Sequence, residues 1–293
     1  EFNGYFKDKA SLCREFGLDP EKQLHLYISS FGYASMSEEE VAELSKMAGT
    51  DFTGFAKTNR ISMQETLRWF DEYLGQHPEV ELVYRRHPSE WNSPALESLA
   101  KKRPNFHVIF ADSVKQWIVA ADSISIWMST AIAEVYMAGK SCHILRPVPI
   151  EHEYDPVIYK DAHYVTSYDA FAAAMAEPEP PFPIAREVIE GYFDPSDTPA
   201  YKRMADLLED VYKNPPRDEP MGAGFTPHFN KLKLCALAGV HFLYKHGWEP
   251  KKVFAFCPPL ADFAQRIYCY VDKAHVTPEQ VAAMTERIKP FVR

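Results

Sequence analysis

The chain has 293 residues, of which 46% are hydrophobic and 25% charged, and its formal net charge is −9. This composition suits a globular protein with a substantial core. It contains no run of about 20 apolar residues and no Lys/Arg-rich block, so we expect neither a transmembrane segment nor a nucleic-acid partner. Its five cysteines are scattered and include no C-x-x-C pair, so we expect neither a disulfide framework nor a metal site.

The first part of the chain alternates apolar, strand-like runs with helical patterns. We expect strands at 23–30, 80–84, 106–110, 123–127, 142–145 and 163–166, and helices at 37–47, 62–76, 93–102, 113–121, 130–138 and 168–175. Short apolar strands separated by helices are typical of βαβ units around a parallel sheet. The sequence therefore predicts an α/β fold, a Rossmann-like parallel sheet flanked by helices.

Three regions are expected along the chain. Residues 1–22 are interpreted as a leading linker, 23–180 as a Rossmann-like domain, and 181–293 as a mostly helical C-terminal region that follows a Pro-rich break. Helical patterns in the last region cover 203–212, 230–246 and 278–288, and a strand pattern covers 252–257. The sequence after the first residues resembles the interior of a protein, so we expect the chain to be a fragment.

Ligands of open parallel sheets bind outside the carboxyl ends of the strands, which directs attention to the loops that follow them. Ser29-Ser30-Phe31-Gly32 follows the first strand, and its small residues would let backbone N–H groups approach a phosphate or sugar. A tight turn between strand and helix explains the same residues. After the third strand, Asp112-Ser113 is better explained as the N-cap of the next helix.

A second candidate loop, Arg85-Arg86-His87-Pro88, follows the second strand. His87 can donate a hydrogen bond to a phosphate oxygen, and Pro88 restricts His87 to an extended backbone. Arg85 or Arg86 can add a bidentate contact to the same phosphate. Solvent-facing arginines and a structural loop histidine remain the alternative.

A third candidate lies after the fourth strand, where Ser129 and Thr130 stand at the expected start of a helix. A helix N-terminus offers free N–H groups and the positive end of a dipole, which suits a diphosphate. Glu134 lies about one helical turn further on and would accept hydrogen bonds from ribose hydroxyls. A capping hydroxyl and an exposed helical glutamate are the alternative.

Taken together, the motifs resemble the donor-binding domain of GT-B glycosyltransferases. Their order along the chain is a His-Pro loop, a Ser-Thr helix start, Glu134 and then Gly139-Lys140. The resemblance covers residues 5–166. It is closest to bacterial surface-carbohydrate and capsule polysaccharide biosynthesis proteins, a group similar to capsule Kdo transferases, polysialyltransferases and CDP-glycerol glycerophosphotransferases. Ser141 stands where the GT-B pattern continues with proline.

The resemblance implies a role for each motif. His87-Pro88 and Ser129-Thr130 would hold the phosphate of a cytidine nucleotide donor, and Glu134 would bind the donor ribose. Ser29-Ser30-Phe31-Gly32 resembles the loop after the first strand of that domain. With Arg85 and Arg86, these residues form the expected donor site, for which we expect no cofactor beyond a CMP- or CDP-linked nucleotide sugar as substrate.

The implied activity is transfer of a sugar or sugar acid from that donor to a glycan or lipid-linked glycan acceptor, in the cytoplasm and in peripheral contact with the inner membrane. Such an enzyme requires an N-terminal GT-B domain for the acceptor, so the chain alone would bind nucleotide and catalyse little, and no catalytic base is identified. Two alternatives remain: a non-catalytic interaction domain that kept the fold, and a nucleotide-sugar 2-epimerase.

Overall fold

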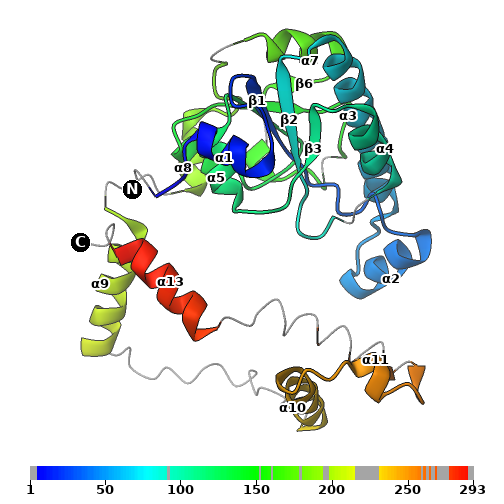
Figure 1. The fold of residues 1–293 in the computed structure, drawn as a ribbon, viewed down its shortest axis with the longest axis vertical. Coiled ribbons are helices and arrows are strands. Elements are labelled where there is room, and N and C mark those ends of the chain that lie inside the picture. Colours follow the sequence, from blue (N-terminus) through cyan, green and yellow to red (C-terminus); the bar gives the residue numbers. More distant parts are fainter. Residues whose placement is uncertain are drawn as a thin grey trace. The chain divides into compact units, whose positions relative to one another are not determined.

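The computed structural model describes residues 5–90, 93–151, 153–159, 161–177, 180–193, 198–214, 231–258, 260–261, 264, 268 and 277–289. The chain divides into two compact units, one of residues 6–195 and the other of residues 196–293 together with 1–5. Within the described part of the second unit the elements are helices: α9 (Ala200–Lys213), α10 (Lys231–Lys245), α11 (Pro250–Val253) and α13 (Pro278–Ile288) (Figure 1).

The unit of residues 6–195 contains one six-stranded sheet, in the order β3-β2-β1-β4-β5-β6. Its strands are β1 (Gln23–Ile28), β2 (Val80–Arg85), β3 (Phe106–Val108), β4 (Ser123–Ile126), β5 (His143–Leu145) and β6 (Tyr164–Val165). Every pairing is parallel, so the predicted α/β, Rossmann-like fold is confirmed. The strand order reverses between β1 and β4, and at such a point the diverging loops leave room for a ligand.

Helices cover both faces of this sheet (Figure 1). The helices of this unit are α1 (Lys9–Phe16), α2 (Glu38–Ala48), α3 (Thr53–Gln76), α4 (Pro94–Lys102), α5 (Val114–Ala120), α6 (Ile132–Met137), α7 (Tyr168–Met175) and α8 (Arg186–Tyr192), with a 3₁₀ turn η1 (Val157–Tyr159); of these, α2 projects away from the sheet (Figure 1). Four of the helices begin at a serine whose side chain accepts a backbone N–H of the first turn: Ser37, Ser93, Ser113 and Ser167. These caps satisfy N–H groups that the helix itself leaves unpaired.

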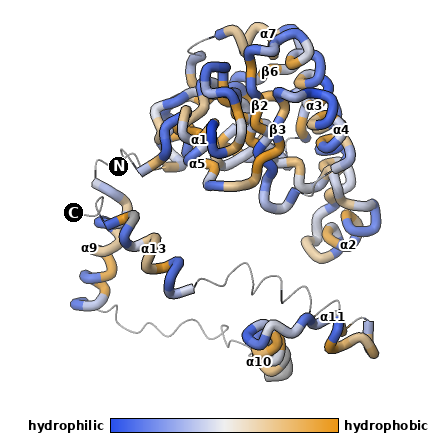
Figure 2. The backbone as a smooth tube through the Cα atoms, viewed as in Figure 1, coloured by the Kyte–Doolittle hydropathy of each residue, from blue (hydrophilic) through white to orange (hydrophobic). Residues whose placement is uncertain are grey.

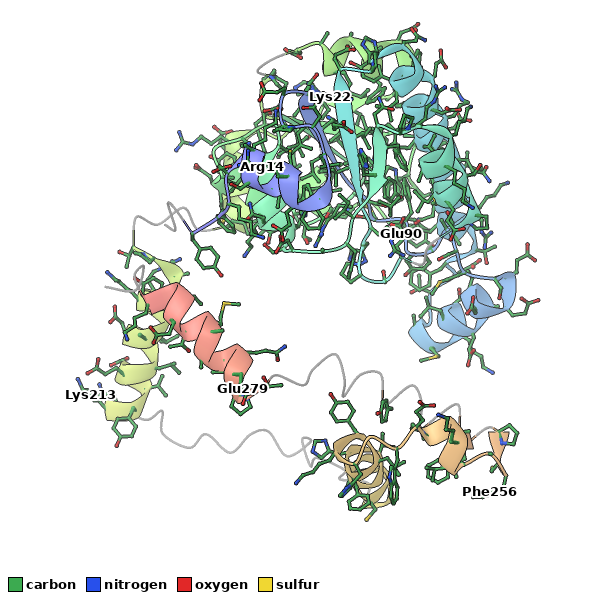
Figure 3. All side chains as sticks on the ribbon, viewed as in Figure 1. Arg14, Lys22, Glu90, Lys213, Phe256 and Glu279 are labelled. Atoms are coloured by element: carbon green, nitrogen blue, oxygen red, sulfur yellow. The ribbon has the colours of Figure 1, made fainter. Side chains whose placement is uncertain are left out.

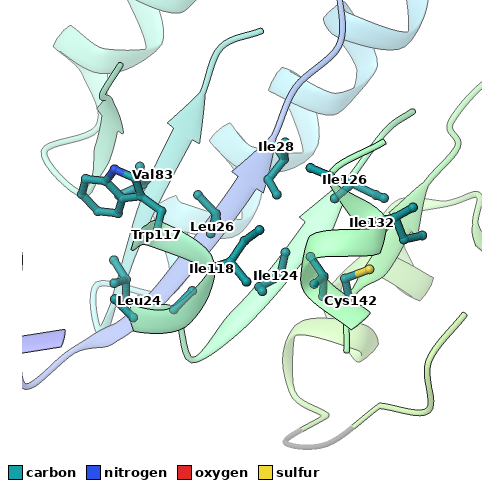
Figure 4. Packing of buried hydrophobic residues seen from close by; sticks show 14 of the residues in the cluster. Leu24, Leu26, Ile28, Val83, Trp117, Ile118, Ile124, Ile126, Ile132 and Cys142 are labelled. Atoms are coloured by element: carbon teal, nitrogen blue, oxygen red, sulfur yellow. The ribbon is translucent and has the colours of Figure 1, made fainter. Parts of the chain in front are cut away.

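Two hydrophobic clusters hold the layers together, one on each face of the sheet. On one face, alternate residues of β1 pack against Trp117 and Ile118 of α5 and Ile132 of α6 (Figure 4). On the other face, Phe70 of α3 and Phe171 of α7 pack against the sheet. Trp117 is fully buried, and truncating a buried aromatic of this kind to alanine typically costs about 3–5 kcal/mol. Figure 2 shows the central strands in hydrophobic colours and the outer helices in mixed ones.

Several sequence expectations differ from the structure. The strand expected at 252–257 is wrong, because Lys252 and Val253 belong to α11. The helix expected to begin at Ser62 is α3, and it begins at Thr53. Within the segment expected to be a leading linker, α1 places Leu12 and Cys13 in the core.

The helix after β4 is also shorter than expected, since α6 begins at Ile132 and not at Thr130. Residues 129–132 form a local turn that leads into this helix. The Ser129 hydroxyl accepts the Ala131 N–H at 3.2 Å, and the Ser129 carbonyl accepts the Ile132 N–H at 3.1 Å.

Candidate anion-binding site

A hollow of about 300 Å³ lies at the carboxyl edge of the sheet, between the loops after β2 and β4. This edge lies at the end of the unit marked by Glu90, which follows β2, whereas Lys22, which precedes β1, marks the opposite end (Figure 3). The hollow is lined by Ile28, Ser29, Arg85, Arg86, His87, Pro88, Phe110, Val114, Ser129, Thr130, Ala131 and Glu134. It therefore brings together all of the expected donor-site residues except Ser30 and Gly32.

The terminal nitrogens of Arg85 are largely engaged by backbone carbonyl groups of the loop after β3. Its side chain is 8% exposed and donates to the carbonyl oxygens of Ala111 and Asp112, with a longer bond of 3.5 Å to that of Ile109. Burial lowers the pKa of Arg85, but a guanidinium keeps its charge at neutral pH. Arg85 thus fixes the loop after β3 and contributes a positive field.

Arg86 is the arginine with donors to spare. One terminal nitrogen donates to the Glu90 carbonyl at 3.4 Å, and its buried Nε has no hydrogen-bond partner among the described residues. A buried donor without an acceptor costs about 1–3 kcal/mol. The N–H groups of the terminal nitrogens of Arg86 outnumber its one hydrogen bond, so Arg86 can donate to an anion in the hollow.

Phe110 forms an aromatic wall that the sequence analysis did not identify. Its side chain is 50% exposed, and the guanidinium carbons of Arg85 and Arg86 lie 5.4 and 5.8 Å from its ring centroid. A half-exposed phenylalanine in a hollow offers a flat surface on which a planar group can stack. Phe110 follows the end of β3, as the expected site residues follow the ends of other strands. The sequence did not predict its role because that prediction rested on polar side chains at the strand ends.

His87 is held in one tautomer by its own loop. The Ser89 N–H donates to Nδ1 at 3.2 Å, the Ser89 hydroxyl lies 2.6 Å from the same nitrogen, and the Glu90 N–H closes the turn onto the His87 carbonyl at 2.9 Å. Because Nδ1 is an acceptor, the neutral ring carries its proton on Nε2. His87 is exposed, so this Nε2–H can donate to a ligand in the hollow.

The buried carboxylate of Glu90 ties this loop to the loop after β1. It accepts hydrogen bonds from the hydroxyls of Ser29 and Tyr84, at 2.5 and 2.7 Å, and from the Phe31 N–H at 3.3 Å. Burial raises the pKa of Glu90, and these hydrogen bonds act against that rise by stabilising its ionised form. Ser29 lines the hollow, but its hydroxyl proton is already donated to Glu90.

Ser30 and Gly32 stand apart from the lining. The Ser30 hydroxyl is buried without a hydrogen-bond partner among the described residues. A Cβ atom on residue 32 would lie 2.7 Å from the Ser89 Oγ. Glycine at this position therefore allows the loops after β1 and β2 to approach closely, and it acts on the hollow only through Ser89 and His87.

On the opposite side, the Ser129-Thr130 turn offers several free donors. The Ser129 hydroxyl accepts the Ala131 N–H and keeps its own proton available. Neither the Thr130 N–H nor the Thr130 hydroxyl has a hydrogen-bond partner in the described part of the chain. With only six residues in α6, these local donors matter more than a helix dipole.

Glu134 brings a carboxylate to the same hollow. It is half-buried, and one of its oxygens lies 3.7 Å from the Nζ of Lys115. An ion pair of this length with an exposed lysine is weak. Glu134 can therefore exchange this contact for hydrogen bonds from hydroxyl groups.

The balance of the lining favours an anion with an attached planar and hydroxylated group. In a chain of net charge −9, the hollow gathers two arginines and a histidine against a single carboxylate. Donors face each other from the β2 and β4 loops, Phe110 supplies an aromatic wall, and Glu134 supplies an acceptor. No cluster of three or more His, Cys, Asp or Glu side chains that could hold a metal occurs in the described ranges.

Comparisons with known proteins do not assign the chain to a family. No protein-family model matches the sequence, and no curated protein matches it. The parallel six-stranded sheet with its flanking helices is a Rossmann-like fold that is compatible with a GT-B enzyme. None of the helices in the described part of the chain is long and apolar enough to cross a membrane.

Proposed function

We propose that this chain is the donor-binding part of a glycosyltransferase, and that its hollow holds the phosphate of a nucleotide sugar. The observation that carries the proposal is the convergence of Arg86, His87, Ser129 and Thr130 on one hollow at the carboxyl edge of the sheet. Each of these residues has at least one donor that no group in the described part of the chain accepts. Donors placed in this way stabilise the negative charge that develops on the leaving nucleotide as the glycosidic bond breaks.

The remaining lining suits the nucleoside. Phe110 provides the stacking surface for a base, and Glu134 accepts hydrogen bonds from ribose hydroxyls. A hollow of about 300 Å³ is at the small end of ligand sites in general. It suits the nucleotide part of the donor, with the sugar extending outward.

The GT-B resemblance of the motifs narrows the proposal. It favours a CMP- or CDP-linked sugar or sugar acid, transferred to a glycan or lipid-linked glycan of a bacterial surface or capsular polysaccharide. In this proposal the reaction takes place in the cytoplasm, in peripheral contact with the inner membrane, and an acceptor domain outside this chain completes the active site. This part supplies donor binding and charge stabilisation, and the chain alone turns over little donor.

Thermal unfolding in the presence of CMP, CDP, UDP, GDP and ADP tests the proposal. A nucleotide present at about 100 times its dissociation constant should stabilise the fold by about 2.7 kcal/mol. We expect a cytidine nucleotide to give the largest rise in Tm and His87→Ala to remove most of it. His163→Ala, which changes an exposed histidine that does not line the hollow, is the matched control.

The other outcomes separate the alternatives. A preference for UDP or GDP keeps the glycosyltransferase and removes the cytidine donor. No shift with any nucleotide in a folded sample contradicts the proposed donor site and favours the interaction domain. Interconversion of a nucleotide sugar without any acceptor would instead identify an epimerase.

A further inference from the structure

The Ser129-Thr130 turn is held by a tyrosine from a distant part of the chain. Tyr159 lies in η1, 30 residues after Ser129, and its side chain is 1% exposed. Its hydroxyl accepts the Ser129 N–H at 2.8 Å and donates to the Ser129 carbonyl, also at 2.8 Å. One side chain thus satisfies both backbone polar groups of the first residue of the turn.

These two hydrogen bonds have a consequence for the hollow. Tyr159 pairs both the N–H and the carbonyl of Ser129. The Ser129 hydroxyl accepts the Ala131 N–H within the turn, and its own proton is left for a ligand. The turn is fixed at its first residue while the Thr130 N–H stays unpaired among the described residues. Free donors held in a fixed geometry bind a ligand with less ordering cost than mobile ones.

Tyr159 is itself held from behind by the segment between β5 and β6. The guanidinium carbon of Arg146 lies 5.7 Å from its ring centroid, and Arg146 pairs with Asp155 at 3.2 Å. The Tyr164 hydroxyl donates to the Tyr159 carbonyl at 2.7 Å. The hydroxyl of Tyr159 therefore has a defined position, set by the buried Arg146 and the half-buried Asp155 and Tyr164, none of which lines the hollow.

From this geometry we infer that Tyr159 is a positioning residue of the anion site, which holds the Ser129-Thr130 turn ready for the phosphate of the nucleotide. The inference rests on the proposed function. It assigns to the β5–β6 segment a part in donor binding, although none of its residues lines the hollow. Of the residues that line the hollow, Tyr159 bonds only to Ser129, at the phosphate end, whereas Phe110 follows β3 and Glu134 lies in α6.

Calorimetric titration of the full chain with CMP and with cytidine tests the inference. In Tyr159→Phe the ring remains but both hydrogen bonds to Ser129 are lost. We expect CMP affinity to fall roughly tenfold while cytidine affinity stays within about twofold. The matched control is Tyr136→Phe, which also removes a tyrosine hydroxyl, one bonded to Glu190 outside the hollow, and should leave both affinities unchanged.

Each outcome decides something. Equal losses for CMP and cytidine in Tyr159→Phe mean a general structural role and overturn the inference, as does unchanged CMP affinity. A wild-type chain that binds CMP no more tightly than cytidine contradicts the phosphate site itself, and the proposed function falls with the inference. If Tyr159→Phe does not fold, Asp155→Asn, which loosens Arg146 behind the ring, replaces it: a smaller loss selective for CMP supports the inference, and wild-type CMP affinity contradicts it.

Discussion

His25 should make the stability of this fold strongly dependent on acid pH. It lies in the middle of β1, fully buried, with Nδ1 2.7 Å from the Ser123 hydroxyl and Nε2 2.8 Å from that of Ser125. Burial lowers its pKa from 6.5 to about 3, with a further small effect from His143 on β5. The neutral ring is satisfied by two hydroxyls, whereas the charged ring has no carboxylate beside it.

The sign and the size of the effect follow from this lowered pKa. Above pH 6.5 the histidine is neutral in both states and the pH has no effect through it. As the pH falls from 6.5 towards 3, the unfolded chain binds a proton that the folded chain does not, so the free energy of unfolding decreases. Between 6.5 and about 3, at about 1.4 kcal/mol per pH unit, the loss amounts to roughly 5 kcal/mol.

Urea denaturation between pH 7 and pH 4 measures this effect. His25→Gln is expected to be less stable than the wild type at pH 7, because the two serine hydroxyls lose a partner, but the difference should shrink steadily as the pH falls. His163→Gln, which removes an exposed histidine, should keep the wild-type slope. If His25→Gln and the wild type lose stability in parallel, the buried neutral histidine is not the source of the acid sensitivity and the reasoning fails.

Three substitutions test other parts of the structure. Gly32→Ala should displace the Ser89 hydroxyl, 2.7 Å from the new Cβ, and weaken CMP binding several-fold with little loss of Tm. Gly191→Ala, where a Cβ meets nothing within 4 Å, should leave CMP affinity unchanged and should not lower Tm, because alanine favours the helix α8. Wild-type CMP affinity in Gly32→Ala would contradict the loop contact. Phe110→Ala should weaken cytidine and CMP alike by about five- to 150-fold, because loss of a stacking aromatic costs about 1–3 kcal/mol. A loss confined to CMP would show that no base stacks there. Ser62→Ala should raise the free energy of unfolding by about 0.5–1 kcal/mol, because the buried Ser62 hydroxyl has no partner among the described residues and alanine favours the helix. A clear decrease in that free energy, measured by urea denaturation, would mean that the hydroxyl is paired.

The sheet could be predicted from the sequence because its strands are short apolar runs separated by helical patterns with clear caps. Some strands are shorter than expected at the carboxyl end, since β1 ends at Ile28 and β4 at Ile126, whereas β2 extends one residue further, to Arg85. The start of α3 was missed because its buried face is partly polar. Asn59, Ser62 and Thr66 are fully buried there beside Phe55 and Phe70, so the apolar period is interrupted.

The place of the candidate site was also predictable, since the carboxyl ends of parallel strands meet at one edge. The residues that hold the site in shape were not. Glu90 meets Ser29 across 61 positions and Tyr159 meets Ser129 across 30, and such pairings depend on the tertiary fold. The sequence likewise could not show that Arg85 donates to three backbone carbonyls whereas Arg86 donates to one.

The central claim, that the hollow binds the phosphate of a nucleotide, is tested most directly by a crystal structure of the chain with CMP. The account predicts the phosphate within hydrogen-bond distance of the His87 Nε2 and the Thr130 N–H, with a guanidinium donor of Arg86 beside it and the base against Phe110. Density for CMP elsewhere on the molecule, or an empty hollow in crystals at saturating CMP, would contradict it.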